Sequence, residues 1–374
     1  MPSPICPQAF LRPAFAPLVT LLLAACGGGA GGEAPVATTL AATPAAPTVT
    51  AAATGTTDAV AASVRSNTGA GAAARRRAAS ATAGSANNDC TAIRPFYWEI
   101  GDSQGASTSG SVGRTSAGRA VRADTKMRYA SASKWIYAAY VAERRGGNLQ
   151  GWDERMLSMQ SGYTHFSNCR SDQSVDACLA WRDNDQFDAA TDGHFFYNGG
   201  HMQKHASLIG LGAMDAPALA AELRARLGQE LDFGMLQASP AGGVTGTPAT
   251  YAQFLRKMIG GELALGGLLG VDAVCASTNG CSPGDVLATP SPTQETWHYS
   301  IGHWVEDDPR LGDGAFSSAG AFGFYPWIDA SRQGYGMVAR DVGVAAAAER
   351  AADGAASARC GRLIRRAWTT GVAQ

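Results

Sequence analysis

A serine and a lysine stand three residues apart in the segment "YASASKWIYAAY", residues 129–140, and this pair can do chemistry. The chain has 30 lysine and arginine residues, of which only four are lysines, so arginine supplies most of its positive charge. Lysine, unlike arginine, readily loses its proton when it is buried. Because apolar residues follow Lys134 directly, we expect its amine to be shielded from water and its pKa to be lowered. The pattern therefore predicts Ser131 as a nucleophile and Lys134 as the base that takes its proton.

The same two residues open a segment with a helical pattern, residues 131–145, which "RRGGN" ends with charge followed by glycine. At the start of a helix, the backbone N–H of Ser131 and the helix dipole favour a developing negative charge. Lys134 lies one turn further along the same face. The structural alternative makes Ser131 a helix cap and lets Lys134 extend to water. The four residues from Ser131 to Lys134 leave both interpretations open.

A second serine, Ser103, matches a different nucleophile motif. Residues 101–105, "GDSQG", fit G-x-S-x-G, which in α/β-hydrolases places the serine on a sharp turn between a strand and a helix. Here "GDSQGASTSGSVG" is polar and rich in glycine and serine, and no helical pattern follows it. A β-hairpin turn explains this segment better than a nucleophile elbow.

The N-terminus is typical of an export signal. Arg12 precedes the apolar run "PLVTLLLAA", which is too short to cross a bilayer. "LAAC", residues 23–26, resembles the lipobox of bacterial lipoproteins, which implies that residues 1–25 are a signal peptide and that Cys26 is lipidated. The alternative is an ordinary signal peptide with an accidental cysteine. We expect an exported bacterial lipoprotein, held only by its N-terminal lipid to a membrane that faces the periplasm or the cell exterior.

Two regions of different composition follow the signal. Residues 26–89 are mostly Ala, Gly, Thr, Pro and Ser, and such a segment buries too little apolar surface to fold, so we expect a flexible tether. Residues 90–374 contain all eight tryptophans and are long enough for one large domain. The net charge of −1 argues against a nucleic-acid-binding surface.

Six cysteines lie within residues 90–374, and an even number in an exported chain favours disulfides. Six cysteines allow about fifteen pairings, so the connectivity is a hypothesis. The spacing favours two short loops, Cys169–Cys178 and Cys275–Cys281, with Cys90–Cys360 joining the two ends of the domain. No C-x-x-C or H-E-x-x-H pattern accompanies these cysteines, so we expect no metal site and no cofactor.

The order of the expected elements predicts an α/β fold of the α+β kind. Aromatic and branched residues predict a strand at 95–102, and strands return beyond residue 297. Between them, residues 150–290 are mostly helical. Strands at both ends predict an antiparallel sheet built from N- and C-terminal segments, flanked by helices and carrying an inserted helical subdomain. The clearest helices are expected at 216–228, 247–261 and 355–368.

Residues 127–140, "MRYASASKWIYAAY", resemble the S-x-x-K region of penicillin-binding proteins and serine β-lactamases, particularly the class C and esterase-like branch. The resemblance runs in order through most of residues 95–340. It implies the β-lactamase/transpeptidase-like fold and a serine hydrolase that forms an acyl-enzyme on Ser131, without a metal or cofactor. The other segments that carry it are "RMLSMQSGY" at 155–163, "FFYNGGHM" at 195–202, "SPAGGVTGTPATYAQFLRKMIGGE" at 239–262 and "SSAGAFGFYPWID" at 317–329.

The family's Tyr-x-Asn motif is altered in this chain. When Asn198 is aligned with the motif, Phe196 occupies the position of the catalytic tyrosine and Tyr197 lies one residue later. The resemblance implies either that Tyr197 is shifted into the base role or that Lys134 acts without a phenol. It also implies that Asn198 orients Lys134 or the substrate. The structural alternative is that the aromatic run "FFY" packs in the core.

The third family motif is altered as well. The family has Lys or His, then Thr or Ser, then Gly, whereas this chain has Ser318, Ala319 and Gly320. The cation that helps to hold the carboxylate of a β-lactam is missing, and such a charge-assisted hydrogen bond is worth roughly 1.5–3 kcal/mol. The oxyanion site needs only backbone donors, here the N–H groups of Ser131 and Ala321. The substitution therefore favours substrates that lack this carboxylate.

We expect a serine hydrolase that acts on a small-molecule, peptide or ester substrate, with carboxylester hydrolysis favoured. The alternatives are a D-Ala-D-Ala peptidase or amidase, a β-lactamase, and a non-catalytic binding protein that retains the fold. Altered second and third motifs also fit a protein that has lost catalysis. Covalent labelling of Ser131 separates the enzyme from the binding protein.

Overall fold

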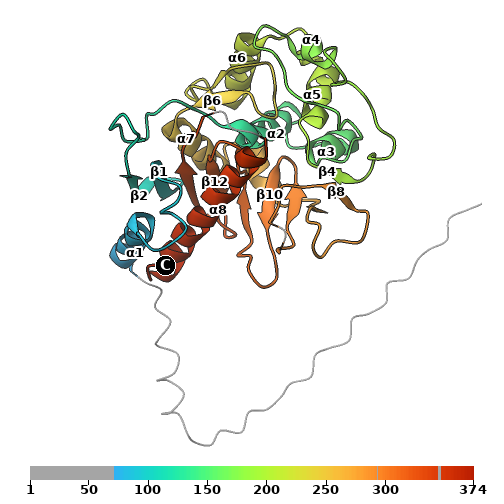
Figure 1. Cartoon of the computed structure of the whole chain (residues 1–374). Coiled ribbons are helices and arrows are strands. Elements are labelled where there is room, and N and C mark those ends of the chain that lie inside the picture. Colours follow the sequence, from blue (N-terminus) through green and yellow to red (C-terminus); the bar gives the residue numbers. More distant parts are fainter. Residues whose placement is uncertain (1–70, 293, 344–346) are drawn as a thin grey trace, which may run out of the picture. The chain divides into compact units, whose positions relative to one another are not determined.

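The computed structural model describes residues 71–292, 294–343 and 347–374 (Figure 1). The expected signal peptide at 1–25, the lipidated Cys26 and the first part of the expected tether lie outside the described residues. Among the residues described, no single helix is long and apolar enough to cross a membrane, and one bent pair of helices meets that test only when its two members are taken together.

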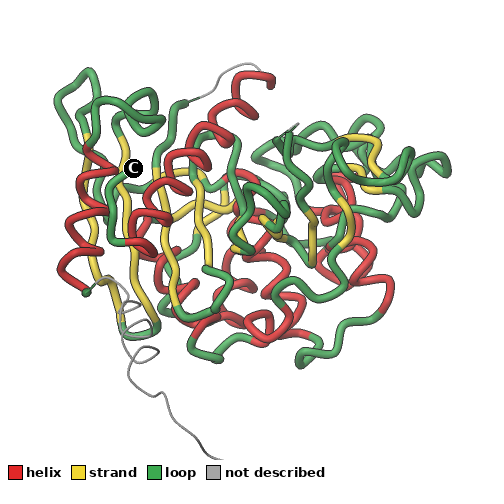
Figure 2. The backbone as a smooth tube through the Cα atoms, turned by 90° about the horizontal axis from the view of Figure 1, so that it is seen from below, coloured by secondary structure: helices red, strands yellow, loops and turns green. Residues whose placement is uncertain are grey.

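A large antiparallel sheet forms the centre of the fold. Its strand order is β2-β1-β13-β12-β11-β10-β9-β7, so strands from the two ends of the chain lie side by side, as the sequence predicts. Figure 2 shows these strands running next to one another beneath the helices. The strands are β1 Phe96–Asp102, β2 Gly105–Val112, β7 Val274–Cys275, β9 His298–Ser300, β10 His303–Glu306, β11 Ala315–Ser317, β12 Tyr325–Ile328 and β13 Gly334–Ala339.

The segment that matches the nucleophile-elbow motif is a hairpin turn between β1 and β2. The two strands pair antiparallel up to Asp102 and Gly105. The Asp102 carboxylate accepts a hydrogen bond from the Gln104 N–H (2.9 Å), which closes the turn. Ser103 is exposed and no helix follows it, so the prediction of a hairpin is confirmed.

Both faces of the sheet are buried, and alternate residues of one strand pack on opposite sides. In β13, Val338 belongs to the apolar cluster that includes helices α1 and α8, whereas Met337 and Ala339 belong to the larger cluster around α2 and α7. Burial on both faces explains why β12 and β13 have nearly continuous apolar runs, whereas the edge strand β2 is polar and partly exposed. Figure 1 shows α8, in red, crossing the strands.

The region between β2 and β9 contains most of the helices, but loops and short strands make up more of it than helices do, so the prediction of a mostly helical segment at 150–290 was right only in part. Helix α7 begins as the sequence predicts, because Thr247 accepts a hydrogen bond from the Thr250 N–H (3.1 Å) and Pro248 occupies the first turn. The helices are α2 Ser133–Arg144, α3 Gly151–Leu157, α4 Val175–Leu179, α5 Gly200–Ala206, α6 Ala216–Leu227, α7 Pro248–Ile259 and, after the sheet, α8 Ala347–Thr370. The short elements are β3 Met127–Arg128, η1 Ala130–Ala132, β4 Phe195–Phe196, η2 Ser207–Leu211, β5 Gly234–Met235, β6 Val244–Gly246, η3 Ala264–Leu268 and β8 Val286–Ala288.

Residues 71–89 differ from the flexible tether expected there. They form helix α1, Ala72–Gly84, whose Ala79 and Ala83 are buried against α8. The Asn88 side chain then donates to the carbonyl oxygen of Gln374 at the C-terminus (3.0 Å). The prediction was wrong for this part because alanine is the best helix former and its small side chain lets two helices approach closely. Composition alone does not reveal that α8 provides a partner face.

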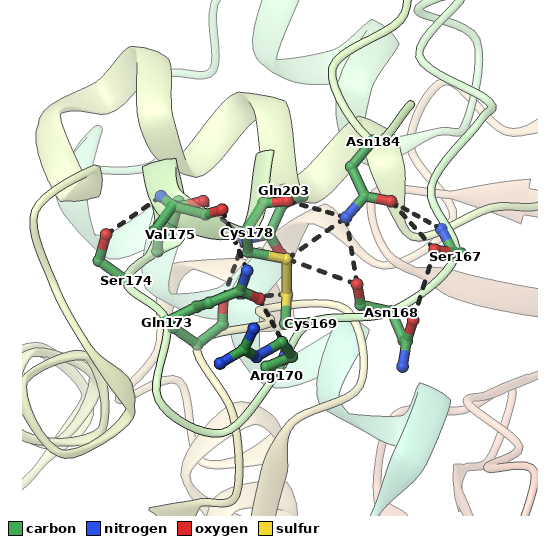
Figure 3. The surroundings of a disulfide bond; sticks show 12 residues. Ser167, Asn168, Cys169, Arg170, Gln173, Ser174, Val175, Cys178, Asn184 and Gln203 are labelled. Carbon is green, nitrogen blue, oxygen red and sulfur yellow. Dashed lines mark hydrogen bonds between the residues drawn. A yellow bond between two sulfur atoms is a disulfide. The ribbon is translucent and has the colours of Figure 1, made fainter. Parts of the chain in front are cut away.

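Three disulfides join the cysteine pairs that the spacing favours. Cys90–Cys360 ties the segment before β1 to α8, and Cys275–Cys281 closes a short loop after β7. Figure 3 shows the third, Cys169–Cys178, whose loop is held by Asn184. The Asn184 side chain donates to the carbonyl oxygens of Asn168 (3.1 Å) and Cys178 (2.8 Å), which fixes a loop that borders the candidate site.

A buried ion network fixes helix α8 to the sheet. The Arg365 guanidinium, only 4% exposed, donates to Glu306 (2.7 Å), Asp313 (2.6 Å) and the Tyr325 hydroxyl (2.9 Å). Removing one partner from such a network leaves a buried unpaired charge, which costs roughly 3–5 kcal/mol. This network and the Cys90–Cys360 disulfide therefore hold α8 in one position, and the first half of α8 reaches the site described next.

Candidate active site

Ser131 lies in η1, a short 3₁₀ turn that leads directly into α2. The preceding residue, Ala130, has a φ of 47°, in the left-handed region that non-glycine residues rarely adopt. Such backbone conformations cost roughly 1–3 kcal/mol, persist only where the surroundings enforce them, and cluster at active sites. The Ser133 hydroxyl accepts a hydrogen bond from the Val244 N–H (3.1 Å), which pins the start of α2 to β6. The position of Ser131 is thus fixed by the chain on both sides.

Lys134 is only 4% exposed, and its Nζ lies 3.1 Å from Ser131 Oγ. The amine also donates to the carbonyl oxygen of Ala241, 3.0 Å away. Burial lowers the pKa of Lys134 from 10.5 to about 7. A neutral amine that donates to Ala241 keeps its lone pair for the Ser131 hydroxyl, so this pair can transfer a proton.

The structure brings together the two residues whose relation the sequence left open. Neither η1 nor α2 has a side-chain cap, and α2 is buried continuously from Ser133 to Ala142. A lysine inside such a helix has no route to solvent along the helix surface. The arrangement therefore differs from the alternative of a capping serine and a solvated lysine.

Tyr197 lies beside the Ser131–Lys134 pair. Its ring stacks on Trp304, with 5.2 Å between ring centroids, and its centroid lies 4.8 Å from Lys134 Nζ. Burial raises the pKa of the phenol to about 12, although the Ser131 hydroxyl and the Trp304 side chain act in the opposite direction. The phenol is protonated at neutral pH, so it can donate a hydrogen bond. Phe195 packs in the core, so the aromatic run divides between core and site.

Asn198 is held by backbone groups, and this corrects one implied role. Its Nδ2 donates to the Phe166 carbonyl (3.2 Å), and its Oδ1 accepts from the Gly200 N–H (2.8 Å). Within the described part of the chain no hydrogen bond joins Asn198 to Lys134, whose amine donates to the Ala241 carbonyl. Asn198 therefore does not orient the lysine. Its side chain does line a cavity at Ser131, where a substrate can contact it.

The segment after β11 closes against the start of α2. The Ser318 hydroxyl, in the place of the family's cation, donates to the Ser131 carbonyl (3.3 Å) and is buried. A Cβ at Gly320 would clash with the Tyr129 carbonyl oxygen, so only glycine allows this approach. Ser318 and Gly320 thus bring the segment up to the turn that carries Ser131.

Two backbone N–H groups near this point, those of Ser131 and Ala321, are available to bind a substrate oxygen. The Gly320 N–H is bound to the Phe324 carbonyl (2.7 Å), whereas among the described residues the Ala321 N–H has no protein acceptor. Ser131 stands at the start of a helical segment, where N–H groups also lack partners within the helix. Ser131 and Ala321, the predicted oxyanion donors, both line the two cavities described next.

Two cavities meet at Ser131 and share Ser131, Tyr197 and Ala321 in their walls. The first, the polar cavity, has a volume of about 380 Å³ and is lined further by polar groups that include Lys134, Asn168, Asn198, Gln237 and Ser239. The second, the apolar cavity, has a volume of about 240 Å³ and is lined further by apolar groups that include Pro290, Pro292, Trp297, Trp304, Ala355 and Ala358.

His201 supports Tyr197 without lining either cavity. Its Nε2 donates to the carbonyl oxygen of Phe196 (2.9 Å), and its Nδ1 accepts from the Ser161 hydroxyl (2.7 Å). Burial lowers the pKa of His201 to about 4, so the ring is neutral. Since both nitrogens are used, the imidazole fixes the backbone just before Tyr197. Sequence reasoning gave this histidine no role.

Other parts of the site had no side-chain signal in the sequence. The acceptor for Lys134 is a backbone carbonyl, that of Ala241, although it lies in a segment that carries the family resemblance. Helix α8 contributes only Gly354, Ala355 and Ala358 to the apolar cavity, and small residues carry no functional pattern. Within the described residues, no group of three or more His, Cys, Asp or Glu side chains is arranged to hold a metal ion.

No family model and no curated protein matches this sequence. Solved structures do resemble it. The chain is similar to a penicillin-binding protein from Bacillus halodurans, at 11% identity and a TM-score of 0.52, over 71% of this chain and 96% of that one. It is similar to the octameric penicillin-binding protein homologue from Pyrococcus abyssi, at 12% identity and a TM-score of 0.50, over 66% of this chain and 69% of that one. A D-stereospecific amidohydrolase from Streptomyces sp. also matches, at 14% identity and a TM-score of 0.48, over 72% of this chain and 94% of that one.

At these identities the likeness shows the fold. The chain has the mixed α/β architecture of β-lactamase and penicillin-binding-protein-like structures, with a large antiparallel sheet and flanking helices. This confirms the fold class predicted from the sequence. The activity has to be argued from the geometry of the site.

Proposed function

We propose that the protein is a serine hydrolase in which Ser131 forms an acyl-enzyme, and that its substrates are carboxylic esters. One observation carries this proposal: a buried lysine whose pKa is lowered to about 7 lies 3.1 Å from a serine hydroxyl that stands at the start of a helix. A lysine of ordinary pKa is charged at neutral pH and cannot accept a proton, whereas this amine can.

Acylation begins when Ser131 Oγ attacks the ester carbonyl carbon and its proton passes to Lys134 Nζ. The new C–O bond turns the carbonyl oxygen into an oxyanion, which the Ser131 and Ala321 N–H groups can hold. The bond to the leaving alkoxide then breaks, and the Lys134 ammonium gives its proton to that oxygen, so an alcohol leaves. The acyl group remains on Oγ as an ester.

Deacylation repeats the same proton transfers with water as the nucleophile. A water molecule gives one proton to Lys134 while its oxygen bonds to the acyl carbon. Collapse of the second oxyanion breaks the bond to Oγ, and Lys134 returns the proton to Ser131, so the acid leaves and the enzyme is restored. Tyr197, whose phenol is protonated, donates a hydrogen bond to the oxygen that gains or loses charge beside Lys134.

Esters are favoured over β-lactams and D-alanyl peptides because no cation replaces the family's third-motif residue. Ser318 occupies that position and is bound to the Ser131 carbonyl. Among the described residues that line the two cavities, Lys134 is the only one with a cationic side chain, and the proposal uses it in neutral form. A carboxylate bound there lacks a partner worth roughly 1.5–3 kcal/mol.

The test is covalent labelling with a fluorescent fluorophosphonate, together with hydrolysis of ethyl acetate followed by acid release. We expect one label per chain on Ser131, located by peptide mass, and loss of both label and hydrolysis in Ser131→Ala. The matched control is Ser103→Ala, the serine of the hairpin turn, which should keep both. An unlabelled Ser131 with no ester hydrolysis would instead indicate a non-catalytic binding protein.

We also propose that the protein is exported and held to a membrane by lipid on Cys26. The three disulfides support an oxidising compartment, since such bonds are rare in the cytosol. Expression in a bacterium with radiolabelled palmitate should give a labelled, membrane-bound protein, and Cys26→Ala should release it unlabelled. A soluble, unlabelled wild-type protein would contradict the proposal.

A further inference from the structure

Three walls of the apolar cavity present mainly apolar atoms. Tyr197, Trp297 and Trp304 form an aromatic wall, and the last two are in edge contact with 6.0 Å between ring centroids. Pro290 and Pro292 form a second wall, and proline offers no backbone N–H. The third wall is α8, and the backbone of Gly320 and Ala321 borders the cavity next to Ser131, so a group that enters from Ser131 meets mainly carbon atoms.

The described walls of this cavity offer no cationic side chain to a charged group. Besides Ser131 and the Tyr197 phenol, three described lining residues have polar side-chain atoms. The Ser291 hydroxyl donates to the Ala276 carbonyl (3.2 Å), the Trp297 indole N–H donates to Glu295 (2.9 Å), and the Trp304 indole lies against Tyr197. The arginine that contacts this part of α8, Arg340, is bound to Asp353 (2.9 Å) and Ser357 (2.9 Å). A carboxylate in this cavity would therefore be desolvated without a partner.

Helix α8 makes room for the cavity by presenting only the smallest residues. A Cβ at Gly354 would stand 3.0 Å from the Gly320 carbonyl oxygen, so the helix approaches the backbone next to Ala321 as closely as its own backbone allows. Ala355 and Ala358 offer one methyl group each. Cys360 and Arg365 lock the helix to the rest of the domain, so this wall has no freedom to withdraw when a large group enters.

The size of the cavity sets the length of the group that it accepts. Its volume is about 240 Å³. A water molecule occupies roughly 30 Å³ in the liquid, so the cavity holds about eight groups of that size. A methylene group is comparable in size, which corresponds to an alkyl chain of about six to eight carbon atoms.

From these observations, we propose that the apolar cavity is the specificity site for an uncharged alkyl or aryl substituent of the ester, about six to eight carbons long, and that Ala355 and Ala358 of α8 set its upper size. This inference rests on the proposed function, because it assigns the substrate class of the same site. The polar cavity then faces the other half of the ester.

The test uses two matched series of esters, ethyl alkanoates and alkyl acetates, each from two to ten carbons. In one series kcat/KM should rise about fourfold per methylene, the factor expected for burying that group, and should level off at six to eight carbons. A terminal carboxylate on the chain of that length, in monoethyl suberate or 6-acetoxyhexanoate, should abolish the gain. Which series rises identifies the half of the ester that enters the cavity.

Two variants locate the effect on α8. Ala355→Phe fills the cavity and should lower kcat/KM for the six- to eight-carbon ester at least about tenfold more than it lowers kcat/KM for ethyl acetate, which buries no chain there. Ala352→Phe, on the exposed face of the same helix, should leave both unchanged. Equal loss on short and long esters in Ala355→Phe would show a structural effect and overturn the assignment.

The outcomes separate this inference from the proposed function. Hydrolysis of ethyl acetate with a flat profile in both series overturns the specificity site and leaves the serine hydrolase standing. An enzyme that prefers the carboxylate-terminated esters also overturns the site. Failure to hydrolyse any ester, with Ser131 unlabelled, overturns the proposed function and the specificity site with it.

Discussion

The two cavities that meet at Ser131 differ in polarity and in the parts of the chain that form them, although they share Ser131, Tyr197 and Ala321. The polar cavity contains Lys134 and several amide and hydroxyl side chains. The described walls of the apolar cavity contain no Asp, Glu, Lys or Arg. The polar cavity is formed mainly by loops between α3 and β6, and the apolar cavity by the segment before β9 and by α8. We infer that proton transfer and recognition of the substrate are divided between these two regions.

Burial of Lys134 in the polar cavity lowers the stability of the fold, and the described walls of the apolar cavity contain no such buried amine. The pKa of Lys134 falls from 10.5 to about 7 on folding, and at 1.36 kcal/mol per unit this corresponds to roughly 5 kcal/mol between its two protonation states. The unfolded chain binds the proton more tightly. The cost is therefore complete below pH 7 and diminishes as the pH rises from 7 towards 10.5. Buried networks elsewhere, such as that of Arg365, help to hold the domain against it.

The largest effect is expected from removing the base in the polar cavity. Lys134→Met should lower kcat/KM for ethyl acetate at least about a thousandfold, within the range for general-base catalysis. Lys134→Arg should not restore activity, because a guanidinium stays charged. Lys126→Met, which alters an exposed lysine, is the control for loss of a lysine elsewhere. Activity of Lys134→Met within tenfold of the wild type would assign the base to another group.

The next effect is the pH dependence that the lowered pKa requires. The neutral amine is the active form, so kcat/KM should fall tenfold per unit below a pKa of about 7 and stay level above it. Between pH 7.5 and pH 5 the loss should reach about a hundredfold. The measurement is kcat/KM for ethyl acetate from pH 5 to 9 in buffers of constant ionic strength. A profile that is flat, or that falls as pH rises through 7, would contradict a neutral Lys134.

The parts of this centre that sequence could predict are those set by local spacing. Ser131 and Lys134 are three residues apart in one helical segment, so the geometry of a helix brings them together. The hairpin at Ser103 follows in the same way from its turn residues, and the start of α7 from Thr247 and Pro248. The antiparallel sheet depends on long-range pairing, but strand-like segments at both ends of the chain indicated it.

The parts that sequence could not predict depend on contacts between distant residues. The Ala241 carbonyl acts through its backbone position, which no side chain marks. The sequence of helix α1 has the composition of a low-complexity segment. The face of α8 that stabilises this helix is distant in the sequence, so composition does not reveal it. Asn198 sits in a recognisable motif, yet its hydrogen bonds go to the backbone of Phe166 and Gly200. A motif identifies the residue, and packing decides what it binds.

A smaller effect is expected at Tyr197, which belongs to both cavities. Its pKa of about 12 keeps the phenol protonated, so it donates a hydrogen bond and does not act as the base. A neutral hydrogen bond is worth about 0.5–1.5 kcal/mol, so Tyr197→Phe should lower kcat about tenfold and change KM little. The pH profile should keep its midpoint near 7, because Lys134 remains the titrating group. A loss as large as that of Lys134→Met would instead make Tyr197 part of the base.

An effect of about the same size as that at Tyr197 is expected from placing a charge in the apolar cavity. Ala355→Arg adds a guanidinium to a wall that is partly open to water, where it can stay hydrated without a substrate. A carboxylate-terminated ester of six to eight carbons should then gain about tenfold in kcat/KM, since a charge-assisted hydrogen bond of at least 1.4 kcal/mol corresponds to that factor. The neutral ester of the same length should lose a similar factor.

Position 355 is a better place for this charge than position 318. Ser318 is buried and its hydroxyl holds the Ser131 carbonyl, so a lysine there would break that bond and desolvate its own ammonium. Ala352→Arg, on the exposed face of α8, is the control for added charge at long range. Equal changes in Ala352→Arg and Ala355→Arg would show that the net charge of the protein matters and not the wall of the cavity. Selective gain in Ala355→Arg alone would show that one helix residue decides which substituent this centre accepts.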